Sequence, residues 1–493
     1  MNEEITKNSL EEKTRRSLNW STASNVLSKL IMPLTNMILA RLLTKDIFGI
    51  VASINIVIAL AEIFADSGFS KYLVQADFES EKQFDVHKSV SFWTSSVVSL
   101  IMLLAIVILR DSLATLIGSE GYGLALAIAA IQIPIYSFSS ISTAILRRNF
   151  EFKKLFFVRM SGVVITLTVS VIFALLKFEH WALIVGSLAS ITFQTVILFI
   201  LSKFKLKFVF NFSVLKQMIY FSINSFLEAL LAWAASSIIL AFVNIKLGND
   251  ISGIYKMGNT TVSGIFNTFS AIFIPVLFSN LSRQKEDNKE FHSTYFAYQR
   301  SAAYVIIPAV IGVTIFSPLI VNIFLGSDWS EVEEIIAFQA TGFAINILFR
   351  SFPGTYFLAK GKPQKLVITQ IIWLLMYLPV SYFAIDLGIV TFVKISVIFN
   401  IVLSLITYVW LYVSYKVSIK ETLLVLVKPI IVSIPMAIIG FLSHKISMNL
   451  FFQLGVIVIC ALIYFGTFYL VFKNDFKKLI SLFVVIKHKK LKE

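Results

Sequence analysis

Long apolar segments recur along the whole chain, and they constrain its fold more than any other feature. Each segment runs for about twenty residues, the length that an α-helix needs to cross the hydrocarbon core of a bilayer. Because lipid offers no hydrogen-bonding partners, only helices and closed barrels satisfy their backbone there. The segments lack the strict alternation of barrel strands, and hydrophobic residues make up 57% of the 493-residue chain. The sequence therefore predicts an all-α, polytopic membrane protein.

The apolar pattern predicts about fourteen transmembrane helices. They lie at residues 18–40, 47–69, 89–109, 123–146, 155–176, 181–202, 217–244, 252–280, 301–324, 332–358, 365–385, 389–413, 423–443 and 450–472. The charged stretch before residue 18 lacks the apolar region and cleavage pattern of a secretory signal. We expect this stretch to be a cytoplasmic tail.

The basic residues support this number of spans and orient them. If the spans alternate from a cytoplasmic N-terminus, 33 of the 43 Lys and Arg residues fall on the inner side, 8 on the outer side and 2 within spans. Cytoplasmic loops of membrane proteins carry such an excess. We therefore expect both termini in the cytoplasm. The net charge of +15 then reflects topology and contact with anionic lipid rather than nucleic-acid binding.

A short motif occurs twice, with an offset of 204 residues. Residues 41–50 read RLLTKDIFGI and residues 245–254 read IKLGNDISGI, with identity at five of ten positions. Chance similarity is the alternative. Each copy joins the first two spans of a half-protein, and an even number of spans separates the copies. The pattern predicts two parallel six-helix repeats related by an axis along the membrane normal.

This repeat divides the chain into five predicted segments. They are a cytoplasmic tail at 1–17, an N-terminal lobe at 18–203, a C-terminal lobe at 217–413, two additional spans within 421–473 and a basic cytoplasmic tail at 474–493.

Several stretches resemble one family of membrane proteins. The charged N-terminal tail, ARLLTKDIFGI at 40–50 and FADSGFSKYLVQ at 64–75 resemble the Wzx-type polysaccharide flippases of the multidrug/oligosaccharidyl-lipid/polysaccharide exporter superfamily. The loops LRRNFEFKKL at 146–155 and LAKGKPQKL at 358–366 also fit that family's equivalent inner loops after the fourth and tenth spans.

The resemblance implies a function. A flippase of this type moves polyprenyl-diphosphate-linked oligosaccharide from the inner to the outer leaflet of the bacterial cytoplasmic membrane by alternating access. The exported unit serves the biosynthesis of surface polysaccharide, such as lipopolysaccharide or exopolysaccharide. The resemblance implies no cofactor beyond a coupling ion, H⁺ or Na⁺, and it implies polysaccharide assembly proteins as further partners.

Polar side chains recur inside the predicted spans. Charged groups in a bilayer cost about 2.5–3.5 kcal/mol each on insertion scales, so they mark interior surfaces. Polar faces occur on the first, fourth, seventh and tenth spans, and their members include Asn25, Lys29, Arg147, Asn224, Glu228, Asn346 and Arg350. A shared hydrated lumen explains the four faces together, whereas separate helix–helix contacts explain each one singly.

The predicted substrate-binding set is centred on Arg350. Its guanidinium offers a planar fork of donors that matches phosphate oxygens; the alternative is snorkelling to the inner interface. The other members are Lys29, Asn25, Asn346, Arg147 and Asn224. Arg147 could instead determine topology, and Lys29 could instead form a structural ion pair.

The predicted ion-coupling set consists of Glu62, Asp66 and Glu228. Glu62 and Asp66 lie four residues apart on one helix face. Burial favours the protonated form of a carboxylate, as a proton carrier requires, and carboxylates with neighbouring carbonyls could also hold sodium. The alternatives are a structural role at the helix end and a pair with Lys29, which could also face Glu228 across a cleft.

No motif indicates an enzyme or a metal site. The chain lacks a phosphate loop, an HExxH motif and a Ser/His/Asp arrangement, and its single cysteine, Cys460, is expected to be a buried hydrophobe. The longest predicted outer segment is about fourteen residues, which is short for a membrane polymerase or ligase that must hold an acceptor. A multidrug exporter of the same superfamily is the other alternative, although Lys29 and Arg350 favour an anionic, sugar-bearing cargo.

Overall fold

The computed structural model describes residues 35–446 and 449–479. In this part of the chain every regular element is a helix, and twelve helices are long and apolar enough to cross a membrane. One of them, α10 (Phe212–Arg283), has 72 residues and a non-helical break at Gly248, so it accounts for two predicted spans. The predicted all-α, polytopic membrane class is confirmed. The first predicted span, 18–40, lies largely outside the described residues.

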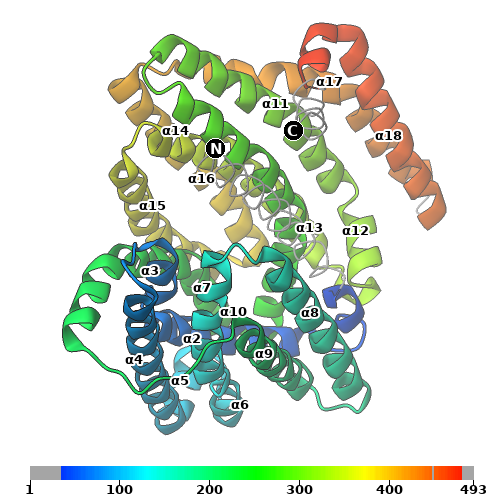
Figure 1. Cartoon of the computed structure of the whole chain (residues 1–493). Helices are drawn as coiled ribbons and strands as arrows, with labels where there is room; N and C mark the ends of the chain where they lie inside the picture. Colours follow the sequence, from blue (N-terminus) through cyan, green and yellow to red (C-terminus); the bar gives the residue numbers. More distant parts are fainter. Residues whose placement is uncertain (1–34, 447–448, 480–493) are drawn as a thin grey trace. The chain divides into compact units, whose positions relative to one another are not determined.

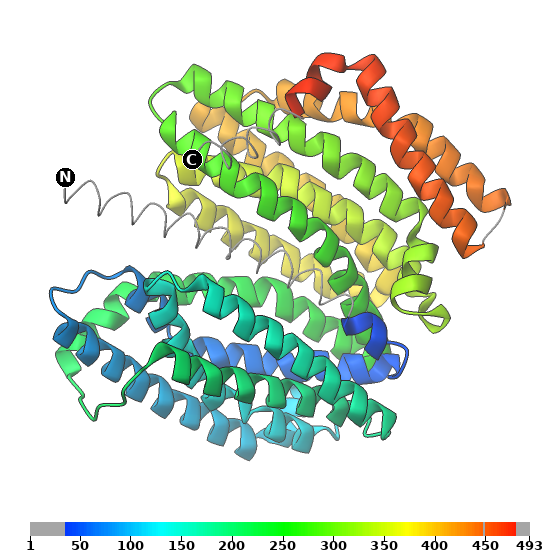
Figure 2. The same cartoon turned by 45° about the vertical axis from the view of Figure 1, so that its right-hand side comes forward.

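The chain packs into two compact units. One comprises the described residues up to Thr260 together with Gln370–Phe392, and the other comprises Thr261–Thr369 together with the described residues from Val393 onward. Helix α10, helix α15 (Pro363–Ala384) and helix α16 (Ile389–Tyr415), which can be followed in Figures 1 and 2, contribute to both units. The predicted lobes at 18–203 and 217–413 rest on the sequence repeat and stay a prediction.

The first unit is a helical bundle. Besides parts of α10, α15 and α16 it contains α2 (Lys45–Asp66), α3 (Phe69–Gln75), α4 (Glu81–Ile108), α5 (Arg110–Leu116), α6 (Gly123–Ala129), α7 (Gln132–Arg148), α8 (Phe152–Leu175), α9 (His180–Ser202) and η3 (Ile385–Leu387). Helix α7 packs against both α4 and α9, and α8 lies along α9 (Figure 1). Buried side chains such as Ile54, Ala65 and Ile133 form the core between α2, α6 and α7.

The second unit contains α11 (Asn288–Ile315), α12 (Ser317–Phe324), η1 (Ser327–Trp329), α13 (Val332–Asn346), η2 (Ile347–Ser351), α14 (Phe352–Ala359), α16 (Ile389–Tyr415), α17 (Ile419–Ile446) and α18 (Leu450–Val471). Helix α17 packs between α11 and α18. Val432, Cys460 and Phe468 belong to the buried apolar cluster that joins these helices. The prediction that Cys460 is a buried hydrophobe is confirmed.

Two helices begin earlier than predicted. Helix α4 starts at Glu81, where the Ser80 hydroxyl accepts a hydrogen bond from the Gln83 amide at 3.2 Å. Helix α11 starts at Asn288, where an Asp287 carboxylate oxygen accepts from the Lys289 amide at 2.9 Å. The predicted starts at residues 89 and 301 were wrong because hydropathy does not detect the polar turns of a helix that extends beyond the apolar run, although Ser and Asp are preferred N-caps.

The two copies of the repeated motif pack against each other. A Cβ atom added to Gly49 would lie 1.9 Å from the Asn249 carbonyl oxygen, and one added to Gly253 would lie 2.0 Å from the Lys45 carbonyl oxygen. Lys45 and Asn249 occupy the same position in the two copies, as do Gly49 and Gly253. The contact is therefore reciprocal. It supports the predicted parallel repeat and explains why both copies need glycine at this position.

We expect Gly253→Ala to destabilise the protein, because the added methyl group must displace the backbone at Lys45. Overpacking of this kind costs about 1–3 kcal/mol. The control is Gly455→Ala, since a Cβ at Gly455 meets no atom within 4 Å; this change should be neutral or slightly stabilising. Thermal unfolding of the purified variants in detergent compares them. Equal midpoints for both variants would contradict the close contact at Gly253.

A basic residue after the fourth span and one after the tenth make equivalent contacts. Arg148, at the end of α7, donates to three carbonyl oxygens at the end of α3 at 2.7–3.3 Å and lies 5.1 Å from the Phe84 ring centre. Lys360, after α14, donates to the Lys285 carbonyl oxygen at 2.9 Å and lies 4.2 Å from the Phe291 ring centre. Desolvation and the charge of Lys285 hold the pKa of Lys360 below its usual range. The two contacts are similar in kind, and the repeat of the two halves stays a prediction.

Candidate functional site

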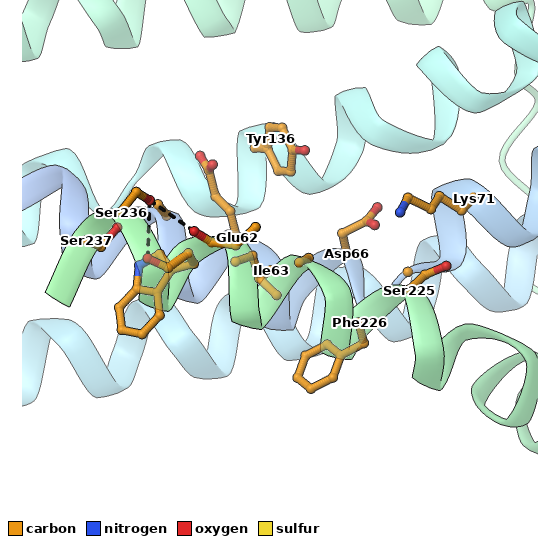
Figure 3. A pocket seen from close by; sticks show the side chains of 14 residues that line it. Glu62, Ile63, Asp66, Lys71, Tyr136, Ser225, Phe226, Ser236 and Ser237 are labelled. Carbon is orange, nitrogen blue, oxygen red and sulfur yellow. Dashed lines mark hydrogen bonds between the residues drawn. The ribbon is translucent and has the colours of Figure 1, made fainter. Parts of the chain in front are cut away.

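A cavity of about 510 Å³ in the first unit brings two of the predicted ion-coupling carboxylates together (Figure 3). Its lining comes from α2, α3, α7 and α10 and comprises Ala59, Glu62, Ile63, Asp66, Gly68, Lys71, Tyr136, Ser225, Phe226, Ala229, Ala232, Trp233, Ser236 and Ser237. Glu62 and Asp66 lie one turn apart on α2, and both are half-buried. The predicted shared face of these carboxylates therefore faces a cavity.

Asp66 is the last residue of α2. Ser67 and Gly68 follow in left-handed backbone conformations, with φ of 47° and 77°, and they end the helix. The C-terminal end of a helix carries partial negative charge, which disfavours a carboxylate. The Ser70 hydroxyl donates to Asp66 Oδ1, and Figure 3 shows the Lys71 ammonium pointing toward the Asp66 carboxylate. The hydrogen bond from Ser70 offsets part of the unfavourable position of Asp66.

Lys71 also connects α3 to α10. Its Nζ lies 2.8 Å from Glu228 Oε2, and the two side chains are 49% and 65% exposed. An ion pair this open to solvent contributes little to stability, so it can exchange partners at low cost. Sequence reasoning missed Lys71 because it lies beyond the apolar part of the second span. Lys29, the predicted partner of Glu228, lies outside the described residues.

The aromatic wall of the cavity is well fixed. The Trp233 indole donates to the Ile56 carbonyl oxygen at 3.0 Å, and the Phe226 ring meets the Phe64 ring edge-on at 5.2 Å. Tyr136 enters from α7, on the predicted polar face of the fourth span. Over the described part of the chain, no group of three or more His, Cys, Asp or Glu residues could hold a metal ion. The arrangement suits uptake and release of a proton or of a single cation.

A second candidate cluster, in the second unit, consists of Arg350 and Asn346. Arg350 lies in η2, a π-helical turn between α13 and α14, and Asn346 immediately precedes this turn. Both side chains are half-buried. Pro353 follows in the first turn of α14 and lacks an amide hydrogen, so it removes one helical hydrogen bond. Single π-turns inside α-helices are frequent at functional sites.

Two buried side chains hold this π-turn from neighbouring helices. Gln299 Nε2, from α11, donates to the Leu348 carbonyl oxygen at 2.8 Å and to Tyr408 Oη, from α16, at 2.6 Å. The Tyr295 and Tyr408 hydroxyls lie 2.9 Å apart. Gln299 therefore binds a carbonyl within the wide turn. Sequence reasoning missed this network because Gln299 fell in a predicted loop and Tyr408 in an apolar run.

We expect Gln299→Leu to let η2 relax toward α-helical geometry, which rotates Arg350 by about 100° relative to α13. The transport activity that the sequence resemblance implies should fall per folded protein, and loss of the buried hydrogen bond should cost about 1–3 kcal/mol of stability. Gln453→Leu is the matched control, because Gln453 is also fully buried but lies on α18. Both variants should unfold at lower temperature. Equal transport by the two variants would refute the positioning role of Gln299.

The other predicted substrate residues do not line the cavity or fall outside the described residues. Arg147 is exposed in the last turn of α7, and Asn224 is exposed on α10 one turn before Glu228. Neither lines the cavity of Glu62. Asn25 and Lys29 fall in the part of the chain that the structure does not describe. The substrate-binding roles of all four stay predictions.

Twelve helices that can cross a membrane, with charged side chains beside a cavity between them, define the described part of this chain as a multi-pass membrane protein. Residues 38–334, more than half of the chain, match the family described as polysaccharide biosynthesis protein. The chain belongs to this family.

Three curated relatives share the greater part of the chain. An uncharacterized membrane protein in the cps region of Klebsiella pneumoniae is 22% identical over 380 residues, covering 76% of this chain and 77% of the relative. The succinoglycan biosynthesis transport protein ExoT of Rhizobium meliloti is 22% identical and covers 66% and 65%. The lipopolysaccharide biosynthesis protein WzxC of Escherichia coli is 18% identical and covers 66% of each chain.

Solved structures share the fold. The lipid II flippase MurJ in an inward closed conformation matches with a TM-score of 0.74 at 16% identity, covering 93% of this chain and 99% of MurJ. An inward-facing multidrug resistance MATE family transporter matches with a TM-score of 0.60 at 16% identity, covering 81% and 94%. At these identities the likeness establishes a shared fold.

Proposed function

We propose that this protein is a flippase that translocates polyprenyl-diphosphate-linked oligosaccharide repeat units from the inner to the outer leaflet for surface polysaccharide biosynthesis. The observation that carries the proposal is the match of residues 38–334 to the polysaccharide biosynthesis family, in a chain whose membrane helices enclose a cavity lined by Glu62, Asp66 and Lys71. A succinoglycan biosynthesis transport protein, a lipopolysaccharide biosynthesis protein and a lipid II flippase are all compatible with such a cargo. The protein acts as a transporter and catalyses no covalent chemistry.

In this proposal one group of residues binds the cargo and another binds the coupling ion. Arg350 binds the diphosphate, with Asn346 beside it for the sugars, because guanidinium and amide groups suit these partners. Glu62 and Asp66 bind the coupling ion, and Lys71 exchanges between Asp66 and Glu228 as the carboxylates change charge. Alternating access then couples ion flow to cargo movement.

The proposed setting is the bacterial cytoplasmic membrane. The excess of Lys and Arg on one side of the alternating spans supports an orientation with both termini in the cytoplasm. In that orientation the carboxylate cavity lies toward the inner half of the second span. The cargo enters from the leaflet where lipid-linked oligosaccharides are assembled.

One observation favours a second candidate, an exporter of cationic compounds. The cavity around Glu62 and Asp66 is acidic and has aromatic walls from Tyr136, Phe226 and Trp233. A positively charged aromatic compound would find both charge complementarity and cation–π partners there. The fold shared with a multidrug transporter is compatible with this reading.

Depletion of the protein in its host distinguishes the two candidates. Membrane-impermeant oxidation of sugars in spheroplasts measures how much lipid-linked oligosaccharide faces outward, while polymer output is followed in parallel. A flippase predicts that completed units accumulate in the inner leaflet and that polymer falls. An unchanged leaflet distribution with greater sensitivity to cationic compounds would overturn the flippase proposal in favour of the exporter.

A further inference from the structure

The segment that joins α9 to α10 alternates basic and aromatic residues. Residues 203–212 read KFKLKFVFNF. Residues 204–211 form no helix, and Figure 1 shows them as a drawn-out segment that passes beside α4. Alternate side chains of an extended chain point to opposite sides. The lysines occupy the odd positions up to 207, and apolar side chains occupy every even position.

Three large apolar side chains toward the end of this segment are mostly exposed, whereas Phe204 at its start is buried in the core of the first unit. Phe208, Phe210 and Phe212 are 89%, 56% and 74% exposed. Both ends of the segment are attached to membrane-crossing helices, since α9 ends at Ser202 and α10 begins at Phe212. The segment must therefore run along the boundary between lipid and water.

Contacts to α4 fix the segment in place. The Trp93 indole donates to the Lys207 carbonyl oxygen at 3.0 Å, and its ring stacks on Phe208 with centroids 4.7 Å apart. The Lys207 ammonium lies 2.6 Å from Asp85 Oδ2. The pair with Asp85 orients Lys207 toward the protein, whereas Lys203 and Lys205 are exposed. These two ammonium groups are available to an external anion.

We propose that residues 203–212 form an interfacial strap that binds the anionic surface of the bilayer. Phe208, Phe210 and Phe212 insert at the level of the lipid headgroups, and Lys203 and Lys205 contact anionic headgroups. Aromatic side chains favour this depth, and basic residues add electrostatic attraction to anionic lipid. The strap links the two predicted repeats, and its role does not depend on the identity of the cargo.

Nitroxide labels test the strap in the full chain. Cys460 is the single cysteine, so Cys460→Ala gives a background in which one cysteine is placed in turn at positions 208 to 212. The labelled protein is reconstituted in vesicles of phosphatidylethanolamine with phosphatidylglycerol, or of phosphatidylcholine alone. Collision rates with oxygen and with a water-soluble nickel chelate report depth. Labels at Leu104, exposed on α4, and at Glu120, exposed in a loop, provide the lipid and water standards.

If residues 203–212 form this strap, the collision rates of the labels should alternate with a period of two residues. Labels at 208, 210 and 212 should collide with oxygen several-fold more often, relative to nickel, than labels at 209 and 211. Removing phosphatidylglycerol should lower this contrast, and Lys203→Gln with Lys205→Gln should abolish its dependence on anionic lipid. The lysine contribution to insertion should be about fivefold for each residue.

Two outcomes would overturn the proposal. Equal nickel access at all five positions in both lipid mixtures would place the segment in water. If the labels were protected from nickel in native membrane vesicles but not in the purified lipid mixtures, the exposed phenylalanines would instead be covered by a protein partner. Either result would leave the proposed transport function untouched, because the labelled positions lie outside both candidate clusters.

Discussion

Replacing Arg350 by alanine should lower transport of lipid-linked oligosaccharide by about 10- to 100-fold, the effect of losing one or two charge-assisted hydrogen bonds to a diphosphate. The side chain is half-buried in a π-turn that Gln299 and Tyr408 hold from outside. Its position is therefore set by the fold. The measurement is the initial rate of outward movement in vesicles that contain matched amounts of protein.

Conservative and remote substitutions separate binding from folding at Arg350. Arg350→Lys keeps the charge but loses the planar fork, so it should transport at a rate between those of the wild type and the alanine variant. Arg110→Ala removes an arginine that is paired with its neighbour Asp111, and it should transport normally. Wild-type rates from Arg350→Ala would remove this residue from the binding site.

Glu62→Gln should abolish the response of transport to an imposed ion gradient. A proton gradient of one pH unit supplies about 1.4 kcal/mol for each coupled proton. It therefore shifts the equilibrium of a coupled step by about tenfold per proton. A glutamine at position 62 keeps the size and polarity of the side chain but carries no exchangeable charge. The variant should therefore transport at the rate that the wild type shows without a gradient. The readout is the ratio of rates with and without the gradient.

The companion variants identify the ion and the partner carboxylate. Asp66→Asn should reduce the same ratio, whereas Glu120→Gln, in an exposed loop, should leave it unchanged. Repeating the series with a sodium gradient at constant pH shows which ion drives transport. A wild-type response to both gradients in Glu62→Gln would exclude Glu62 from coupling.

The spans and the carboxylate pair could be predicted because they depend on local patterns. Apolar length alone identified the membrane helices. Glu62 and Asp66 share a helix face through their four-residue spacing, and the structure confirms this spacing on α2. The repeated motif alone places Gly49 and Gly253 at equivalent positions, and the structure shows that each approaches the backbone of the other copy closely.

The rest of the candidate site depends on contacts between distant segments. Lys71 became relevant only because the short helix α3 brings it to Glu228, 157 positions further along the chain. The π-turn around Arg350 has no sequence signature beyond Pro353, since it is held by hydrogen bonds from α11 and α16. Residues predicted as a loop, including Gln299, proved to be the inner turns of a long helix.

The most direct test of the central proposal uses the purified protein in liposomes that contain polyprenyl-diphosphate-linked oligosaccharide in one leaflet. An impermeant reagent that modifies the sugar then measures how much cargo reaches the opposite leaflet with time. The flippase account predicts protein-dependent movement that an ion gradient accelerates and that Arg350→Ala suppresses. Movement equal to that in protein-free liposomes, with the protein folded and inserted, would contradict it.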